Sequence, residues 1–222
     1  MEIPITSEGN PPNKANIYET LFVFMDNVLF NFKPSISNIG ENKITQDLEI
    51  SLNEESRVND TSFAFQNQHE EGNVVTDIGV YLRNSRYFFC WIEAKRLPTP
   101  KEKDRDEREY VIVCQEKIDG KKKFKGNGGI QRFKEGKHAP GLDYSIMIGY
   151  IQDDNNADYW WSRINTWITE LADVNSEFWS NEDCLNKCIA NKCERFLSIH
   201  KRKDKTPITL HHYWIKLWNK TQ

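Results

Sequence analysis

The chain has 222 residues, a net charge of −3 and 28% charged residues, and it carries twelve Phe, eight Tyr and seven Trp. A chain of this length supports one well-buried core, and its aromatic content argues against a disordered protein. We therefore expect residues 1–222 to form one domain with a polar lead at 1–15. No apolar stretch approaches the length of a bilayer span, so we expect no membrane segment.

The amino terminus and the cysteines bear on the cellular compartment. The first sixteen residues are polar and contain no apolar run preceded by basic residues, unlike a secretory signal. The five cysteines are an odd number, and Cys90 lies within an apolar run. This pattern fits reduced thiols better than a disulfide framework. Both features predict a cytoplasmic protein.

Two amphipathic helices are predicted before any strand. Residues 16–32 have apolar side chains at three- and four-residue spacing, and Pro34 ends the pattern. A second helix is expected over about 41–54 because apolar residues recur there at four-residue intervals. These residues are Ile44, Leu48 and Leu52.

Three strands follow, because the apolar pattern loses its helical period. We expect them at residues 62–69, 76–82 and 87–97. The short polar connections between them favour successive antiparallel hairpins. The third segment is almost continuously apolar, as expected of a central strand covered on both faces.

The middle of the chain changes in composition. Residues 98–110 are rich in proline and charge, which predicts an exposed loop or a short helix. A glycine-rich segment at 125–129 leads into a predicted helix over 130–139. A strand is expected at 145–152, followed by a helix at 157–172 with a wide apolar face.

The carboxyl-terminal part leaves one alternative open. Residues 195–202 predict a strand, and residues 208–218 predict either a strand or a helix. On a strand, the neighbours His211 and His212 would face opposite ways, one packed and one solvated. The whole order of elements predicts an α/β fold, with a mixed central sheet flanked by helices.

Three residues in the predicted hairpin suggest chemistry. Glu93 and Lys95 are two apart on an apolar strand, so they share one face of the sheet. A hairpin would place Asp77 of the preceding strand beside Glu93. Two neighbouring carboxylates repel each other and favour a bound cation, and oxygen ligands suit magnesium, with manganese as a substitute. A bound divalent ion would support phosphodiester hydrolysis, with Lys95 positioning the attacking water.

This spacing, Asp77 followed by Glu93-Ala94-Lys95 at the end of an apolar strand, resembles the PD-(D/E)xK nuclease superfamily, which has the restriction-endonuclease-like fold. The resemblance covers residues 41–152 and implies a metal-dependent nuclease. Thr76 stands where the motif has its proline.

The resemblance also implies further site residues on the flanking helices. A helical acid often joins the metal site, and Glu41 matches it best, with Asp47 and Glu49 as rivals because the helix phase is open. Gln131 falls where RecB-like members carry a glutamine on the next helix. Their tyrosine four residues later is replaced here by Glu135.

Basic residues cluster after the predicted site, with eight bases against two acids in residues 117–137. Four basic side chains fall in the predicted helix that begins after the glycine-rich turn. We expect them to form a surface that binds phosphate groups, or else the exposed side of an amphipathic helix with Ile130 and Phe133 turned inward. These four residues are Arg132, Lys134, Lys137 and His138.

The sequence therefore predicts a magnesium-dependent endonuclease acting on nucleic acid, with DNA favoured over RNA. Family association suggests a setting in restriction or phage defence, and a homodimer or a partner protein such as an ATPase. The alternative is a non-catalytic nuclease-like module that binds nucleic acid or a partner protein. A third reading makes Glu93 and Lys95 a structural ion pair.

Overall fold

The computed structural model describes residues 14–35, 40–71, 74–84, 87–100, 106–118, 121–125, 128–188 and 192–217. The helices are α1 (Lys14–Asn31), α2 (Glu41–Val58), α3 (Gly129–Lys134), α4 (Ala157–Val174) and the short 3-10 helix η1 (Asn181–Asp183). The strands are β1 (Phe63–Glu71), β2 (Val74–Leu82), β3 (Tyr87–Leu97), β4 (Val113–Ile118), β5 (Lys121–Lys125), β6 (Tyr144–Ile151), β7 (Asn186–Lys187), β8 (Glu194–Lys201) and β9 (Pro207–Lys216).

Seven strands form a mixed sheet in the order β1-β2-β3-β6-β9-β8-β7. β1, β2 and β3 form an antiparallel meander, whereas β3, β6 and β9 run parallel. β8 and β7 extend the sheet with antiparallel pairs. The predicted α/β class with a mixed sheet is confirmed, and the ambiguous segment at 208–218 contains a strand, β9.

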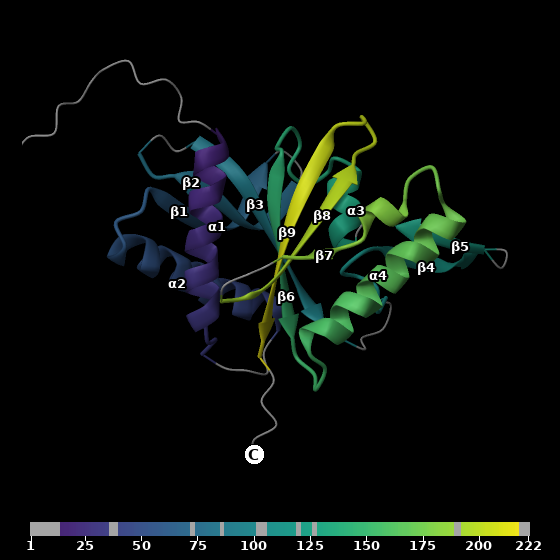
Figure 1. The fold of residues 1–222 in the computed structure, drawn as a ribbon, viewed down its shortest axis with the longest axis horizontal. Coiled ribbons are helices and arrows are strands. Elements are labelled where there is room, and N and C mark those ends of the chain that lie inside the picture. The colour runs from purple at the N-terminus through teal and green to yellow at the C-terminus, as the bar shows by residue number, and fades with distance from the viewer. Residues whose placement is uncertain are drawn as a thin grey trace, which may run out of the picture.

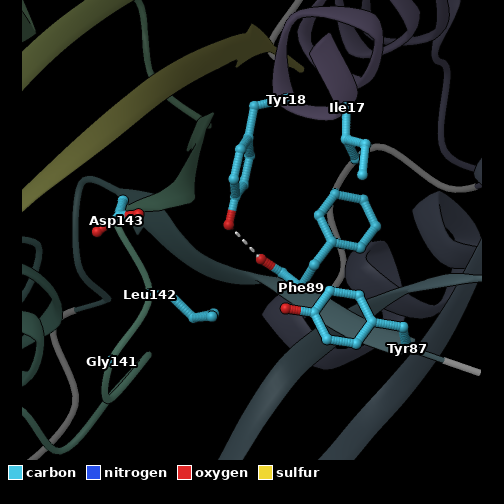
Figure 2. A pocket seen from close by; sticks show the side chains of 7 residues that line it. All are labelled: Ile17, Tyr18, Tyr87, Phe89, Gly141, Leu142 and Asp143. Atoms are coloured by element: carbon cyan, nitrogen blue, oxygen red, sulfur yellow. Dashed lines mark hydrogen bonds between the residues drawn. The ribbon is translucent and has the colours of Figure 1, made fainter. Parts of the chain in front are cut away.

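Helices cover both faces of this sheet (Figure 1). α1 and α2 pack on one face, where one apolar core cluster joins them to β1–β3, β6 and β9. α3 and α4 pack on the other face in a second cluster that includes Trp91 and Trp214. Figure 2 shows one contact of α1 with the sheet, in which the Tyr18 hydroxyl donates to the Phe89 carbonyl at 2.6 Å. Side chains on β3 therefore alternate between two cores.

The connection after β3 differs from the prediction. The part of 98–110 that the structure describes is not all exposed, because Tyr110 is completely buried. Residues 1–13 of the polar lead at 1–15, residues 101–105, and Gly126 and Asn127 of the glycine-rich turn lie outside the described residues. The two-stranded sheet β4–β5 was not predicted.

A close backbone approach explains the glycines at the start of α3. A Cβ on Gly128 would lie 2.2 Å from the Ile112 Cα, and a Cβ on Gly129 would lie 2.6 Å from the Tyr110 carbonyl oxygen. Amides in the first turn of α3 donate to the carbonyl groups of residues 109–111. These amides are therefore already occupied by carbonyl groups of the protein and are not available to a phosphate.

Two other predictions are corrected by the described segments. α3 ends at Lys134, so Lys137 and His138 lie beyond the helix that was expected over 130–139. The neighbours His211 and His212 do face opposite cores, but both are buried, at 6% and 0% exposure. Among the helices that the structure describes, none combines the length and apolar character needed to cross a bilayer.

Candidate metal and phosphodiester site

The candidate site lies where β2 and β3 separate. The register of this pair runs from Leu82–Tyr87 to Ile78–Ile92, and the last part of β3 pairs with β6 on its other side. At the point of separation, the buried Thr76 hydroxyl donates to the Ile92 carbonyl at 3.0 Å. A proline at this position, as in the family motif, would lack that donor.

Two carboxylates replace the missing strand partner. Asp77 Oδ2 accepts a hydrogen bond from the Ala94 amide at 2.7 Å. Glu41 Oε2, from the first turn of α2, accepts one from the Arg96 amide at 3.0 Å. Successive amides on one side of a strand lie two residues apart, so both acids lie along the same free edge of β3.

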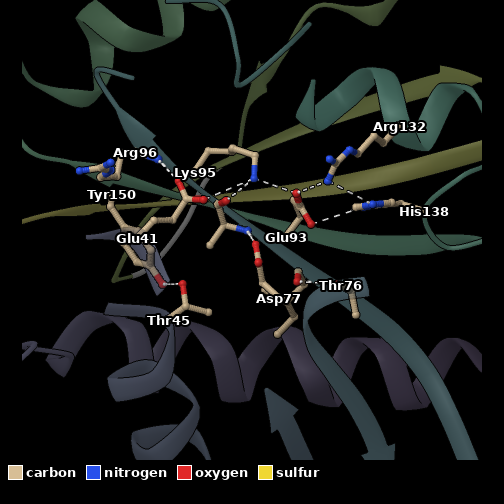
Figure 3. Close-up of polar contacts among 12 residues, drawn as sticks. Glu41, Thr45, Thr76, Asp77, Glu93, Lys95, Arg96, Arg132, His138 and Tyr150 are labelled. Atoms are coloured by element: carbon tan, nitrogen blue, oxygen red, sulfur yellow. Dashed lines mark hydrogen bonds and ion pairs between the residues drawn. The ribbon is translucent and has the colours of Figure 1, made fainter. Parts of the chain in front are cut away.

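Lys95 is surrounded by oxygen atoms at this edge (Figure 3). Its Nζ lies 2.8 Å from Glu93 Oε1, 2.8 Å from the Ala94 carbonyl oxygen and 3.6 Å from Glu41 Oε1. Glu93 is 2% exposed and Lys95 is 7% exposed. An ion pair buried to this degree is costly to desolvate and persists only with several hydrogen bonds.

The segment around α3 supplies the other side of the site. Arg132 Nη1 lies 3.4 Å from Glu93 Oε1, and its side chain is 30% exposed. His138 Nδ1 lies 3.4 Å from Glu93 Oε2, and its ring packs against Trp91 and Phe133. Because the Arg132 guanidinium only donates and lies 3.5 Å from His138 Nε2, the neutral ring carries its proton on Nδ1, which forms no hydrogen bond with Glu93.

The acids of the site outnumber its cations, and this raises the cost of ionising Asp77. Burial and the neighbouring Glu93 carboxylate together raise the pKa of Asp77 to about 6, against the lowering effect of Lys95. Burial and the charge of Arg132 lower the pKa of His138 to about 3, so this ring is neutral at pH 7. Three ionised acids would therefore face two permanent cations, Lys95 and Arg132.

Lys95 keeps its proton in this environment. Burial alone would lower its pKa, but the carboxylates of Glu93, Glu41 and Asp77 raise it above the ordinary value. The side chain is thus a fixed cation that donates hydrogen bonds, and it is not a general base while these acids are ionised.

The structure distinguishes the three candidate helical acids. Glu41 contacts Lys95 and the end of β3, as described above. Asp47 accepts hydrogen bonds from Ser35 instead, and Glu49 accepts one from Asn53. Glu41 is therefore the helical acid that joins the site.

The predicted residues of the α3 segment separate into two groups. Arg132 and His138 meet Glu93, whereas the Gln131 amide donates to Glu135 at 3.0 Å. Lys134 is 1% exposed and pairs with Asp183 at 2.7 Å, so it does not belong to a phosphate-binding surface. Lys137 is exposed and pairs with Glu135. The contact between Arg132 and Glu93 was not anticipated.

The oxygen donors at this site suit a hard divalent ion. Among the residues that the structure describes, no group of three His, Cys, Asp or Glu side chains is arranged to hold a metal. Asp77 and Glu93 supply two carboxylates, and the Ala94 carbonyl adds a third oxygen that already faces the Lys95 ammonium. Magnesium is commonly bound through one or two carboxylates with water and phosphate completing its shell, and Asp77 and Glu93 would supply those two carboxylates.

Comparison of the chain with protein-family models, with curated proteins and with solved structures found no match.

Proposed function

We propose that this protein is a divalent-metal-dependent endonuclease, a phosphodiester hydrolase that acts on nucleic acid, with DNA as the first candidate substrate. The observation that carries the proposal is the edge where β2 leaves β3, at which Glu41 and Glu93 contact the Lys95 ammonium and Asp77 accepts from the adjacent Ala94 amide. A fold gains little stability from three partly buried acids that share two cations. Their presence together therefore favours a functional role.

In this proposal Asp77, Glu93 and the Ala94 carbonyl hold the ion, with Glu41 next to them. A divalent ion held there would polarise a phosphoryl oxygen and lower the pKa of a bound water. Lys95, which is cationic, would orient the attacking water and stabilise negative charge as it builds on the phosphoryl oxygens. The Lys95 ammonium contacts Glu93 and the Ala94 carbonyl, so it lies beside the proposed ion ligands.

Arg132 is suited to bind the substrate. Its guanidinium touches Glu93 while 30% of its side chain is exposed, so it links the buried acids to the surface. A guanidinium forms paired hydrogen bonds with phosphate oxygens. The neutral His138 is buried behind it, with Nδ1 3.4 Å from Glu93 Oε2 but without a hydrogen bond between them.

A test is cleavage of supercoiled plasmid and of single-stranded DNA by wild type and Lys95→Ala, with magnesium, manganese or EDTA. We expect metal-dependent cutting that falls by about 100-fold or more in Lys95→Ala. Lys187→Ala is the matched control, because the contacts of this exposed lysine are with Asp158 and the Trp161 ring. Equal cleavage by Lys95→Ala and wild type would refute the mechanism.

A second candidate is a non-catalytic module with a nuclease-like fold. It is favoured by one observation, namely that Asp77 and Glu41 each satisfy a β3 amide that has lost its strand partner. A purely structural role would explain those contacts. Under this alternative no cleavage occurs under any condition, and magnesium leaves the melting temperature unchanged.

A further inference from the structure

A second group of buried polar side chains lies beside α3. Lys134 Nζ pairs with Asp183 Oδ1 at 2.7 Å and lies over the rings of Phe178 and Trp179. Asp183 belongs to η1, which follows α4. Since successive helical residues are rotated by about 100°, Lys134 points nearly opposite to Arg132, away from Glu93.

From Asp183 a continuous chain of hydrogen bonds crosses to β8 and β9. Neighbouring polar atoms in this chain lie 2.6–3.0 Å apart. Every member is at least 95% buried. The chain, which we name the Asp183 network, consists of Lys134, Asp183, His200, Ser198, His212, Tyr110 and Trp214.

The two ends of this network fix the direction of its hydrogen bonds. The Trp214 indole can only donate, so its proton goes to the Tyr110 oxygen, and the Tyr110 hydroxyl then donates to Nδ1 of His212. Nε2 of His212 must therefore carry the ring proton and donate to Ser198. The Ser198 hydroxyl in turn donates to Nε2 of His200.

The hydrogen bonds at the Asp183 end of the network have the same donor-to-acceptor direction. His200 Nδ1 donates to the Asp183 carboxylate, which can only accept when ionised. Burial lowers the pKa of His200, although Asp183 raises it in part, and burial lowers the pKa of His212 well below its usual value. Two neutral rings with opposite tautomers thus satisfy every donor in the chain.

Asp183, His200 and Ser198 also stand in the order of a hydrolytic triad, but the arrangement does not support that chemistry. Ser198 is 1% exposed, and its oxygen already accepts the His212 proton. A nucleophilic serine needs a free approach for its substrate. The Asp183 network is therefore not a hydrolytic triad, and its role is structural.

The Asp183 network is connected to the Glu93 site through α3 and the segment that follows it. The Lys134 carbonyl accepts from the Lys203 amide at 3.0 Å, in the turn between β8 and β9. The Arg202 guanidinium in that turn donates to the Ala139 and Leu142 carbonyls. The segment that follows α3 is thus fixed on its far side, while residues 132 and 138 contact Glu93 on its near side.

We propose that the Asp183 network positions α3, holding Lys134 in place so that Arg132 and His138 stay in contact with Glu93. Asp183, Lys134 and His200 are positioning residues, because they act through α3 and do not touch the candidate metal ligands. The catalytic consequence rests on the proposed nuclease function, whereas the positioning itself does not.

Nitrogen-15 NMR of the histidine side chains tests this directly, because nitrogen shifts distinguish the two neutral tautomers. In the wild type we expect the Nδ1–H form for His200 and the Nε2–H form for His212. In Asp183→Asn the His138 signals should move, because the neutral amide no longer balances the Lys134 ammonium that holds α3 in place. Glu182→Gln, an exposed neighbour in η1, is the control and should leave them in place.

A role in stability alone would not move the His138 signals in the folded state. Unchanged His138 signals in Asp183→Asn, or the opposite tautomers in the wild type, would overturn the proposal. If Asp183→Asn does not fold, Lys134→Gln releases the same contact from the other side and should give the same shift.

Cleavage adds an independent readout. If the wild type cuts DNA, Asp183→Asn should lower kcat on the order of tenfold while leaving KM within about twofold. If the wild type does not cut, the proposed function fails, and the His138 signals still decide whether the network positions α3.

Discussion

Two groups of buried charged residues lie on either side of α3, and they are built differently. The Asp183 network has one carboxylate, one ammonium and two neutral histidines, and each donor has an acceptor. The site around Glu93 has three carboxylates against two cations, and one of those cations, Arg132, is 30% exposed. The first group is buried and its one negative charge is matched by one positive charge. The second group is partly exposed to solvent at Arg132 and has more negative than positive charges.

This difference separates a structural role from a functional one. A buried network in which every group is paired adds rigidity and has no use for another ligand. A site with surplus carboxylates has a raised pKa at Asp77 and is suited to a cation. Removing one charge should therefore have opposite effects on stability in the two groups.

The largest expected effect is a loss of stability in Asp183→Ala. This change leaves the Lys134 ammonium and the His200 Nδ1 proton buried with no carboxylate to accept them. We expect the free energy of unfolding to fall by about 3–5 kcal/mol, measured by urea denaturation. Glu182→Ala, at an exposed position in the same short helix, should change it by less than about 0.5 kcal/mol. Equal urea midpoints for Asp183→Ala and Glu182→Ala would show that the Asp183 carboxylate is not needed to stabilise the buried Lys134 and His200.

Asp77→Asn should have the opposite sign in the absence of metal. Because the pKa of Asp77 is raised to about 6 in the folded protein, ionisation of this carboxyl group opposes folding at pH 7. The asparagine oxygen can still accept from the Ala94 amide, and its NH₂ group can donate toward Glu93. We expect the metal-free variant to be more stable than wild type by about 1–3 kcal/mol. Asp158→Asn, at an exposed carboxylate, should show no such gain.

The pH dependence should follow from the same shift. Between the unfolded pKa of about 4 and the folded pKa of about 6, the folded protein binds more protons than the unfolded chain at Asp77. The Asp77 contribution therefore favours folding at low pH and is lost as the pH rises through 6. Subtracting the Asp77→Asn stability curve from that of wild type should isolate it. A flat difference between pH 4 and 7 would contradict the raised pKa.

The smallest effect concerns the neutral hydrogen bond beside the site. Thr76→Val keeps the side-chain shape and removes the bond to the Ile92 carbonyl, which should cost about 1 kcal/mol in unfolding free energy. Thr166→Val removes a bond from an exposed threonine on α4 to the Ser162 carbonyl and should cost less than about 0.5 kcal/mol. A loss at Thr76 as large as that expected for Asp183→Ala would mean that separation of β2 from β3 depends on this one bond.

Local patterns predict much of this fold and the centre of the site. The alternation in β2 and β3 and their short connection place Asp77 beside Glu93, and two-residue spacing places Lys95 on the same face. These features depend on neighbouring segments of the chain, so the sequence contains them directly.

The remaining contacts depend on distant segments. Lys134 and Arg132 look alike in the sequence, and only the packing of η1 decides that Lys134 is covered while Arg132 is not. The six residues of α3 are too few to define an apolar face that would distinguish Gln131 from Arg132. The bond between Tyr110 and His212 joins residues 102 positions apart, and no local period predicts such a contact.

The most direct test of the central claim is the change in melting temperature that magnesium causes at constant ionic strength, in wild type, Asp77→Asn and Asp183→Asn. At about 100 times its dissociation constant, the ion should stabilise the wild type by about 2.7 kcal/mol, a rise of roughly 5–10 °C. Asp183→Asn, although less stable, should show the same rise, and Asp77→Asn should show none. No rise in wild type, or an equal rise in Asp77→Asn, would contradict a metal site at Asp77 and Glu93.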